Sequence, residues 1–329
     1  MPTVHPVAQI LAQRRNEGSL PGARTDGYRV GLVVEGGGMR GLISAAMLAT
    51  LLDRKLEHSF DAIYTFSAGA LNSVYFLTGL GWYAVAIYYD YLACRGFFDV
   101  GRLFRGRPAL SLDCALEVVV ESTRPLDYAA VLASPIELHI VASSIQELKP
   151  RVFTDFTSRG DLKMALRATC CIPIAAGAPI AYDGDRFLDG GVLLAHPVLP
   201  ALDGGCTHIL ALRTRTHPSF QAITSPGQRA LAGYLQRMRQ GLGTAYLKTV
   251  RRSRQLHLHF QQSSRNPEKP PFVLEITCPV GSHRITRFSL DQGVLLQGLR
   301  AGYCAMANAL DGNNSTDQVY LQPAVFISS

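Results

Sequence analysis

The sequence predicts an α/β fold in which helices cover a mostly parallel central sheet. The main observation is a pair of consecutive units between residues 28 and 78, each with an apolar strand, a turn of small residues and a helix. The second is the composition, with 47% hydrophobic and 17% charged residues, which favours a large buried core and argues against disorder. The third is the length of 329 residues, which fits one large α/β domain or two small ones.

The first quarter of the chain supplies the two units. A polar lead-in over residues 1–27, with one short helix near 6–15, precedes an apolar strand that ends in three glycines. A helix with regularly spaced apolar residues follows over 39–56. Residues 60–66 form the second strand, and the second helix is expected over 68–78.

The rest of the chain is expected to extend the sheet and its helical cover. We expect mostly helix over 80–134, a strand over 136–145, a helix over 161–173 that Pro173 stops, strands over 208–214 and 272–279, a basic helix or helix pair over 230–254, and a last helix over 289–310. The weakest internal boundary lies around 216–228 or at the polar stretch 261–271.

The charge balance is basic, with a formal net charge of +7. A phospholipid surface, a nucleic acid and an acidic substrate all fit such a charge, and the charge alone does not choose among them. No motif for nucleic-acid binding accompanies it, so we expect no nucleic-acid partner. The segment Ala62–Tyr89 lacks charged residues, but its internal glycines and polar residues favour a buried strand and core helix over a membrane span.

The seven cysteines indicate a reducing compartment. Their number is odd, and no pair or Cys/His cluster has the spacing of metal ligands, so no metal site is predicted. Adjacent Cys170 and Cys171 are expected to be small core residues. Arg14, Arg15 and Glu17 stand where a secretory signal would be apolar, so we expect a cytoplasmic protein.

A glycine-rich turn after the first strand offers a place for negative charge. It consists of Gly36, Gly37, Gly38, Met39, Arg40 and Gly41. Glycines let consecutive N–H groups point at one spot, and the following helix adds its positive end, which is how an oxyanion hole is built. The same residues match the dinucleotide fingerprint G-x-G-x-x-G, but that motif needs an acidic residue at the end of the second strand, and Asp61 begins it. A purely structural turn is the remaining alternative.

The second turn holds a candidate nucleophile. The run Thr65-Phe66-Ser67-Ala68-Gly69 is similar to the nucleophile elbow G-x-S-x-G, with threonine in place of the leading glycine. A serine before a helix is also a common N-cap, so this stretch alone leaves both roles open. The two units together favour the nucleophile, because they bring both turns to the carboxyl edge of one sheet, where α/β proteins bind ligands.

The proton acceptor is better sought among carboxylates than among the nine histidines. His139 is expected to be a half-buried sheet residue, His257 and His259 look like one face of an edge strand, and His196 precedes a proline. Asp189 ends a short apolar strand and is followed by two glycines, which allow a bend that aims the carboxylate into a cleft. The alternative is a hairpin turn, which the stretch YDGDRF just upstream supports. Direct proton transfer to Asp189 would require close contact with the serine.

In this order and spacing, the three motifs resemble the patatin-like phospholipase family, in its bacterial type. Gly36–Gly41 matches the G-G-G-x-R-G oxyanion motif, and Ser67 matches the serine of the elbow. Asp189, Gly190 and Gly191 match the D-G-G motif, which supplies the other half of a Ser-Asp dyad.

The resemblance covers roughly residues 28–215, which would form the catalytic core, with 216–329 completing the same domain. It implies a three-layer α/β/α fold, no metal or cofactor, and hydrolysis of acyl esters of lipids. Backbone N–H groups of Gly37, Gly38 and Met39 would hold the oxyanion. Two residues depart from the family pattern: Thr65 replaces the elbow glycine, and His196 stands where many members have asparagine.

Other functions remain open on the sequence. The same dyad serves an acyltransferase or a thioesterase, and a decayed lipid-binding relative is a further alternative. Aromatic residues over 76–91 and arginines over 101–108 suit a membrane interface, although a core helix and a solvated loop explain them equally well. Arg251, Arg252 and Arg254 form a second basic run that suits anionic lipid. The sequence does not indicate an oligomeric state.

Overall fold

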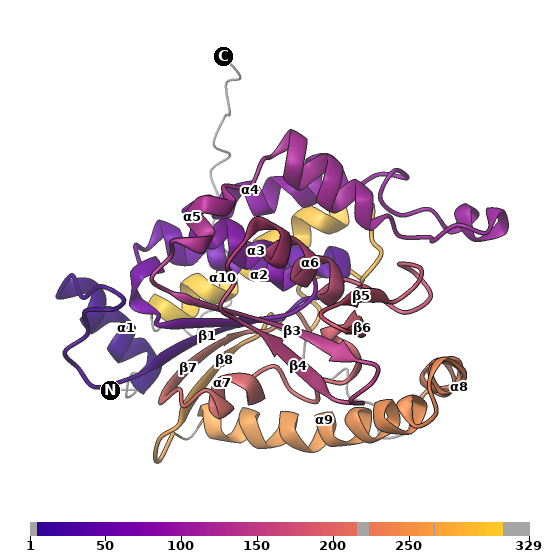
Figure 1. The fold of residues 1–329 in the computed structure, drawn as a ribbon. Coiled ribbons are helices and arrows are strands. Elements are labelled where there is room, and N and C mark those ends of the chain that lie inside the picture. Colours follow the sequence, from indigo (N-terminus) through magenta and orange to yellow (C-terminus); the bar gives the residue numbers. More distant parts are fainter. Residues whose placement is uncertain (1–4, 216–223, 266, 312–329) are drawn as a thin grey trace.

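A computed structural model describes residues 5–215, 224–265 and 267–311. Their strands form one sheet in the order β5-β6-β3-β2-β1-β7-β8, with β4 paired to β3 (Figure 1). The bounds of the strands are β1 Val30–Val34, β2 Ala62–Thr65, β3 Glu137–Ser144, β4 Pro150–Phe153, β5 Ile180–Tyr182, β6 Asp185–Asp189, β7 His208–Leu212 and β8 Phe272–Ile276. The central run from β3 to β8 is parallel, whereas β4, β5 and β6 pair antiparallel.

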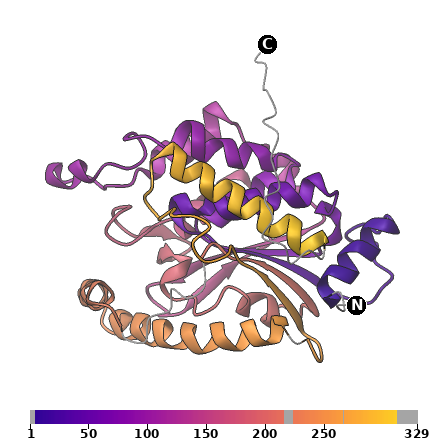
Figure 2. The same ribbon diagram turned by 180° about the vertical axis from the view of Figure 1, so that it is seen from behind.

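Helices lie on both faces of the sheet, so the predicted α/β class and its three layers are confirmed (Figures 1 and 2). The α-helices are α1 Pro6–Asn16, α2 Gly41–Asp53, α3 Ala68–Leu77, α4 Gly81–Ala86, α5 Tyr128–Leu132, α6 Arg159–Thr169, α7 Leu199–Asp203, α8 Pro226–Met238, α9 Leu242–Arg265 and α10 Gln292–Asp311. On one face, α2 packs between α3 and α10, and on the other face α9 packs on β8. The long α10 therefore brings the end of the described chain back over the first crossover helix.

Short helical segments complete the layers. They are η1 Gly38–Arg40, η2 Glu57–Ser59, η4 Val100–Arg105 and η6 Gly190–Val192, which are 3₁₀ turns, and η3 Ile87–Leu92 and η5 Cys114–Thr123, which are π-helical. Three of the six, η3, η4 and η5, lie in the region expected to be largely helical between residues 80 and 134.

The two predicted strand–turn–helix units are adjacent in the sheet. β1 and β2 are parallel neighbours, and Val34 and Thr65, their last residues, are register partners. Both strands are fully buried, as expected for apolar runs covered on two faces. Val34 is also in register with Leu212 at the end of β7. Three strands thus end at one edge, and the segments that follow them meet there.

Several expectations from the sequence were wrong or incomplete. His257 and His259 belong to α9 and not to an edge strand, because the basic region forms a pair of helices that continues to Arg265. The strands β4 and β5 were missed, since they are short and pair only at the antiparallel side. α6 ends at Thr169, before Pro173. Of the predicted weak boundary at 216–228, residues 216–223 lie outside the described residues.

No helix in the described ranges combines the length and the apolar character needed to cross a bilayer. All seven cysteines are free, and Cys170 and Cys171 are buried, as expected for small core residues.

Candidate active site

Ser67 occupies the sharp turn between β2 and α3. Its backbone has φ of 56° and ψ of −141°, a conformation that costs a non-glycine residue about 1–3 kcal/mol. The Ser67 N–H donates to the Thr169 hydroxyl at 2.8 Å, and that hydroxyl donates to the carbonyl of Val141 at 2.6 Å. The serine side chain makes no capping hydrogen bond to α3, so the N-cap alternative does not account for it. The turn is held from the neighbouring strand β3 while its hydroxyl stays available.

The glycine-rich loop packs directly against this turn. A Cβ added to Gly36 would lie 2.5 Å from the Cβ of Ser67, and one added to Gly41 would lie 2.8 Å from the Cβ of Ala68. Gly69 approaches the carbonyl of Val34 so closely that its Cβ would lie 2.5 Å from the oxygen. Larger residues at these positions would push the loop and the turn apart, so the glycines set their contact distance.

Hydrogen bonds within the loop narrow the set of oxyanion donors. The N–H of Met39 donates to the carbonyl of Arg287 at 3.0 Å, and the N–H of Arg40 donates to Gly37. The N–H of Gly41 donates to the carbonyl of Gly38. Met39, predicted as a donor, is therefore engaged elsewhere. Within the described residues, the N–H groups of Gly36, Gly37 and Gly38 have no hydrogen-bond acceptor.

Asp189 reaches the same place from the antiparallel side of the sheet. It ends β6, and its Oδ1 accepts the N–H of Gly191 at 2.8 Å. A Cβ added to Gly190 would lie 2.8 Å from the Cβ of Phe66, so the D-G-G turn rests against the residue before Ser67. The hairpin turn proposed as an alternative also exists, but it joins β5 to β6 upstream and leaves Asp189 at the far end of the strand.

The electrostatics of Asp189 reflect two opposing causes. Burial raises the pKa of its carboxyl group. The nearby Ser67 side chain opposes this, as do the positive charges of Arg287 and Arg215. The effect of burial is the larger one, so the pKa of Asp189 lies above its usual value. Asp189 is therefore a stronger base than an ordinary aspartate.

The two departures from the family pattern both fit this geometry. Thr65 is buried as the last residue of β2, and its hydroxyl donates to the carbonyl of Val34 at 3.2 Å. It is not among the residues with positive φ, so it does not need glycine. His196 is buried, and its Nε2 accepts a hydrogen bond from Arg213 at 2.7 Å. Neither residue disturbs the turns around Ser67.

A buried ionic network, which the sequence did not indicate, lies behind the glycine-rich loop. Glu35 follows β1, and its Oε2 accepts hydrogen bonds from Nε of Arg213 and from the N–H of Thr214. Arg213 also pairs with Glu275 of β8. Burial alone would raise the pKa of Glu35, but the charges of Arg213, Arg215 and Arg40 hold it at about 2. Because the Thr214 hydroxyl donates to the carbonyl of Gly36, the network is tied to the loop itself.

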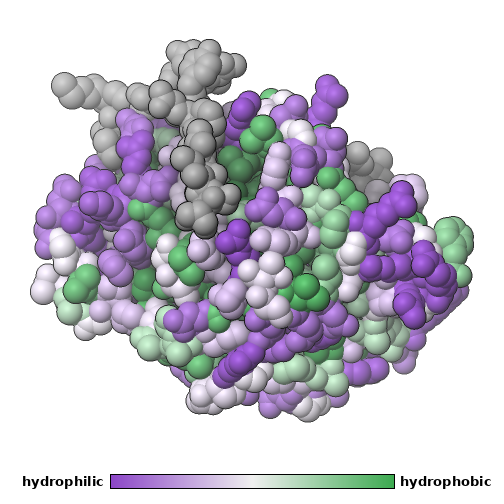
Figure 3. All heavy atoms as spheres, turned by 90° about the horizontal axis from the view of Figure 1, so that it is seen from above, coloured by the Kyte–Doolittle hydropathy of each residue, from purple (hydrophilic) through white to green (hydrophobic). Residues whose placement is uncertain are grey.

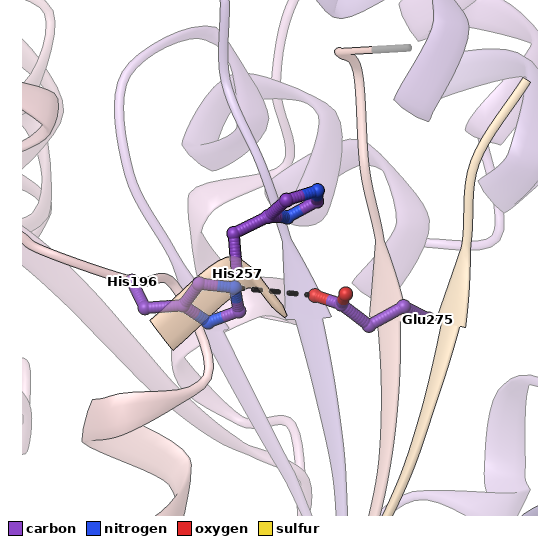
Figure 4. Close-up of side chains that lie close together, drawn as sticks. All are labelled: His196, His257 and Glu275. Carbon is purple, nitrogen blue, oxygen red and sulfur yellow. Dashed lines mark ion pairs between the residues drawn. The ribbon is translucent and has the colours of Figure 1, made fainter. Parts of the chain in front are cut away.

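His196, His257 and Glu275 come close enough to suggest a metal centre (Figure 4). Their ligand atoms lie within 4.8 Å of one another, and two histidines with a carboxylate are typical zinc ligands. However, Nη1 of Arg213 stands 2.7 Å from Nε2 of His196 and pairs with Glu275, and a guanidinium there repels a metal cation. Burial and the Arg213 charge also lower the pKa of His196 to about 2. We therefore assign this cluster to the ionic network.

Ser67 and Asp189 lie between two hollows of different character. An apolar cavity of about 50 Å³ begins at Ser67 and is lined by side chains of α3, η3 and η5, among them Leu71, Tyr88 and Val120. On the other side, a cleft of about 1070 Å³ is bordered by Asp189, by Val100 and Leu103, and by α8 and α9. An ester at Ser67 therefore has an apolar space on one side and, on the other, a wide cleft lined by both apolar and charged residues.

Comparison with known proteins identifies the family to which the sequence is similar. The family model for the patatin-like phospholipase matches residues 32–202, more than half of the chain. The uncharacterized protein YjjU of Escherichia coli (strain K12) is 29% identical over 252 residues, which cover 75% of this chain and 67% of that protein.

Two solved structures are remotely similar. VipD from Legionella pneumophila has a TM-score of 0.49 at 11% identity, covering 87% of this chain and 67% of its own. Human GIVD cytosolic phospholipase A2, in complex with a fluorophosphonate inhibitor, has a TM-score of 0.41 at 13% identity, covering 94% of this chain and 63% of its own.

The backbone of Ser67 leads to a prediction about stability. Glycine adopts a positive φ without strain, so Ser67→Gly should be more stable than Ser67→Ala by about 1 kcal/mol, after the greater entropy of unfolded glycine is subtracted. Urea denaturation measures the difference. Ser73, in the middle of α3, is the matched control: there the glycine variant should be less stable than the alanine variant by about 1 kcal/mol. If alanine is the more stable residue at both positions, Ser67 is not strained.

Proposed function

Because the chain belongs to the patatin-like phospholipase family, we propose that it hydrolyses fatty-acyl esters of lipids, with Ser67 as nucleophile and Asp189 as proton acceptor. The observation that carries the proposal is the contact of three turns. Ser67 stands on a strained turn, Gly36 packs against its Cβ, and the Asp189 carboxyl group interacts with its side chain. A nucleophile, its base and a source of oxyanion donors thus come from three strand ends.

Acylation of Ser67 would proceed without a histidine. Asp189 accepts the proton of Ser67 as Oγ forms a bond with the ester carbonyl carbon. The charge that develops on the carbonyl oxygen is held by the N–H groups of Gly37 and Gly38, and one such donor is worth about 2.7–4 kcal/mol of barrier. When the C–O bond of the ester breaks, the alcohol leaves with the proton from Asp189, and the acyl group remains on Ser67.

Deacylation would use the same groups, with water in place of Ser67 as the nucleophile. A water molecule attacks the acyl carbonyl while Asp189 accepts its proton, and the same two N–H groups hold the oxyanion. As the bond to Oγ breaks, Ser67 recovers the proton and the fatty acid is released. The raised pKa of Asp189 suits both steps, because a base is most effective when its pKa approaches the working pH.

The two hollows beside Ser67 support a lipid ester as substrate. The acyl part would enter the apolar cavity lined by α3, η3 and η5, and the alcohol part would lie in the cleft beside Asp189. In the present conformation the apolar cavity has room for a few carbon atoms only. Two of its walls, η3 and η5, are π-helical, a form that recurs at functional sites, so we propose that they move apart to admit a longer chain.

We also propose that the segment Val100–Arg105 docks the protein on a lipid surface in the cytoplasm. It projects from the body at the end of the molecule opposite α1 (Figures 1 and 2). Phe104 at its tip is 91% exposed, Leu103 is 45% exposed, and Arg105 and Arg107 flank them. Apolar and hydrophilic surface lie side by side at this end (Figure 3). Because Val100 and Leu103 also line the cleft, a docked membrane would face the entrance to Ser67.

The function is tested by ester hydrolysis with two variants. Ser67→Ala and Asp189→Asn should each lower kcat for a p-nitrophenyl ester and for a phospholipid by about a thousandfold or more, since the residues act as a unit. Free fatty acid in the products distinguishes hydrolysis from transfer of the acyl group to another acceptor. Asp189→Asn should be at least as stable as the wild type at neutral pH, because burial disfavours the ionised carboxylate that it replaces. Wild-type rates in either variant would exclude the dyad.

The pH dependence follows from the direction of the Asp189 shift. Asp189 must be ionised to accept a proton, and burial raises its pKa. The acidic limb of kcat/KM should therefore have its midpoint above the ordinary aspartate pKa of about 3.9, with activity lost as the pH falls through it. The profile is measured with a short water-soluble ester at pH values from about 3.5 to about 9, roughly the span between the pKa values of aspartate and tyrosine. A rate that stays constant down to the lowest pH would show that a less perturbed group is the base.

Membrane docking is tested at the tip of the projecting segment. Phe104→Asp should weaken binding to anionic vesicles by about tenfold or more, because burying a phenylalanine side chain contributes about 1.5–3 kcal/mol. Leu20→Asp is the control, since Leu20 is 54% exposed and follows α1 at the opposite end. Vesicle flotation measures both variants. Equal effects at the two ends would argue against a specific docking segment.

A further inference from the structure

Three arginines beside the glycine-rich loop outnumber the carboxylates that the described residues place near them. Arg40 belongs to the loop, Arg215 follows β7, and Arg287 precedes α10; together they line a hollow of about 540 Å³. Among the described residues, Glu35 acts on Arg40 and Arg215, and Asp189 lies near Arg215 and Arg287. Oε2 of Glu35 is already bound by Arg213 and Thr214, and Nε of Arg215 lies 3.6 Å from its Oε1. The positive charge at this place therefore exceeds the negative charge that the described residues supply.

The pKa values of the arginines reflect this excess. Burial and the charges of Arg215 and Arg287 lower the pKa of Arg40 to about 10. Burial also lowers the pKa of Arg215, and the charges of Arg287 and Arg213 act in the same direction, although 40% of the Arg215 side-chain surface remains exposed in the hollow. Nε of Arg40 is buried without a hydrogen-bond partner. An anion in contact with these groups would relieve their mutual repulsion.

Arg215 and Arg287 are the two of these arginines that also face the site of the proposed reaction. Both line the large cleft together with Asp189, and the charges of both lower the pKa of that carboxyl group. Arg287 is anchored over the glycine-rich loop, because its carbonyl accepts the N–H of Met39 and its Cγ would lie 2.7 Å from a Cβ at Gly38. Its side chain is exposed and forms no ion pair with the residues that the structure describes.

We propose that Arg215 and Arg287 form a subsite for the phosphate of an anionic lipid headgroup, placed beside Ser67. The inference rests on the proposed ester hydrolysis and adds the class of headgroup. Guanidinium groups bind phosphate oxygens in pairs, and two of them at one rim of the cleft match a phosphodiester in the alcohol part of the substrate.

The described lining of the cleft offers no free carboxylate to a headgroup that carries a positive charge. Among the described residues that line the cleft, the carboxylates are Glu35 and Asp189, and both already have partners. A headgroup that carries an ammonium group, such as choline, finds no free anion there and meets several arginines instead. A headgroup without a cation, such as glycerol, avoids that repulsion. The enzyme should therefore prefer phosphatidylglycerol to phosphatidylcholine with the same acyl chains.

A competition assay tests the preference. The two lipids are present in equal amounts in the same non-ionic detergent micelles, so that surface charge is identical for both, and mass spectrometry resolves their products. The wild type should prefer phosphatidylglycerol by about tenfold or more, because the arginines repel the ammonium group of phosphatidylcholine, whereas both lipids offer them the same phosphate. Arg215→Gln and Arg287→Gln should each reduce that ratio by about tenfold, and Arg287→Lys should reduce it less.

Arg300→Gln is the matched control, since Arg300 is exposed on α10, away from the residues that line either hollow. It should leave the ratio unchanged. The ratio also cancels any effect of the lost charge on the pKa of Asp189, because that effect is common to both lipids. Equal hydrolysis of the two lipids by the wild type would overturn the headgroup preference, and arginine variants that hydrolyse both lipids as fast as the wild type would overturn the subsite.

A binding experiment separates this inference from the proposed reaction. Calorimetry on Ser67→Ala should show that sn-glycerol 3-phosphate binds, that glycerol does not, and that Arg215→Gln together with Arg287→Gln weakens binding by about tenfold or more. Inorganic phosphate that binds as tightly as glycerol phosphate would overturn the headgroup assignment and indicate a site for free phosphate. Binding through the arginines in a protein that hydrolyses no ester would support the subsite and refute the proposed function. Hydrolysis without any such binding would refute the subsite alone.

Discussion

The candidate site depends on the close approach of three turns that leaves no room for side chains between them. Gly36 and Gly190 both press on the turn that carries Ser67, the first through the Cβ of the serine and the second through Phe66. These contacts are possible because β1 and β2 are in parallel register and end together. β6 reaches the same edge from the antiparallel side, after pairing with β3. A methyl group on any of these glycines would separate the nucleophile from its neighbours.

The ionic network behind the loop explains how such a contact is kept in place. A buried ion pair gains little stability by itself, since its desolvation offsets the attraction. Here Glu35 and Arg213 follow neighbouring parallel strands, and Thr214 links them to the carbonyl of Gly36. The network therefore fixes the direction in which the loop leaves the sheet. It also leaves Arg215 short of negative charge, which connects the support of the loop to the proposed recognition of an anionic headgroup.

The sequence was sufficient for those parts of the fold and the site that depend on local pattern. The strand–turn–helix units around Gly36 and Ser67, and the strand end at Asp189, follow from apolar spacing and small residues. Contacts between distant segments could not be read in the same way. The sequence near Arg287 does not indicate that its carbonyl accepts a hydrogen bond from the N–H of Met39. The sequence near Thr169 likewise does not indicate that its hydroxyl accepts one from the N–H of Ser67. Glu35 and Arg213 did leave a signal, since each is a charge that ends an apolar strand, and their pairing could have been inferred from it.

In the proposed mechanism, Asp189 and not a histidine activates the Ser67 hydroxyl. The most direct test of this mechanism is the rate at which a fluorophosphonate labels the protein, followed by peptide mass spectrometry to locate the adduct. We expect a single adduct on Ser67 and a large decrease in its rate of formation in Asp189→Asn, with no decrease in His196→Asn. An adduct on another residue, or equal labelling rates with and without the Asp189 carboxylate, would contradict the mechanism.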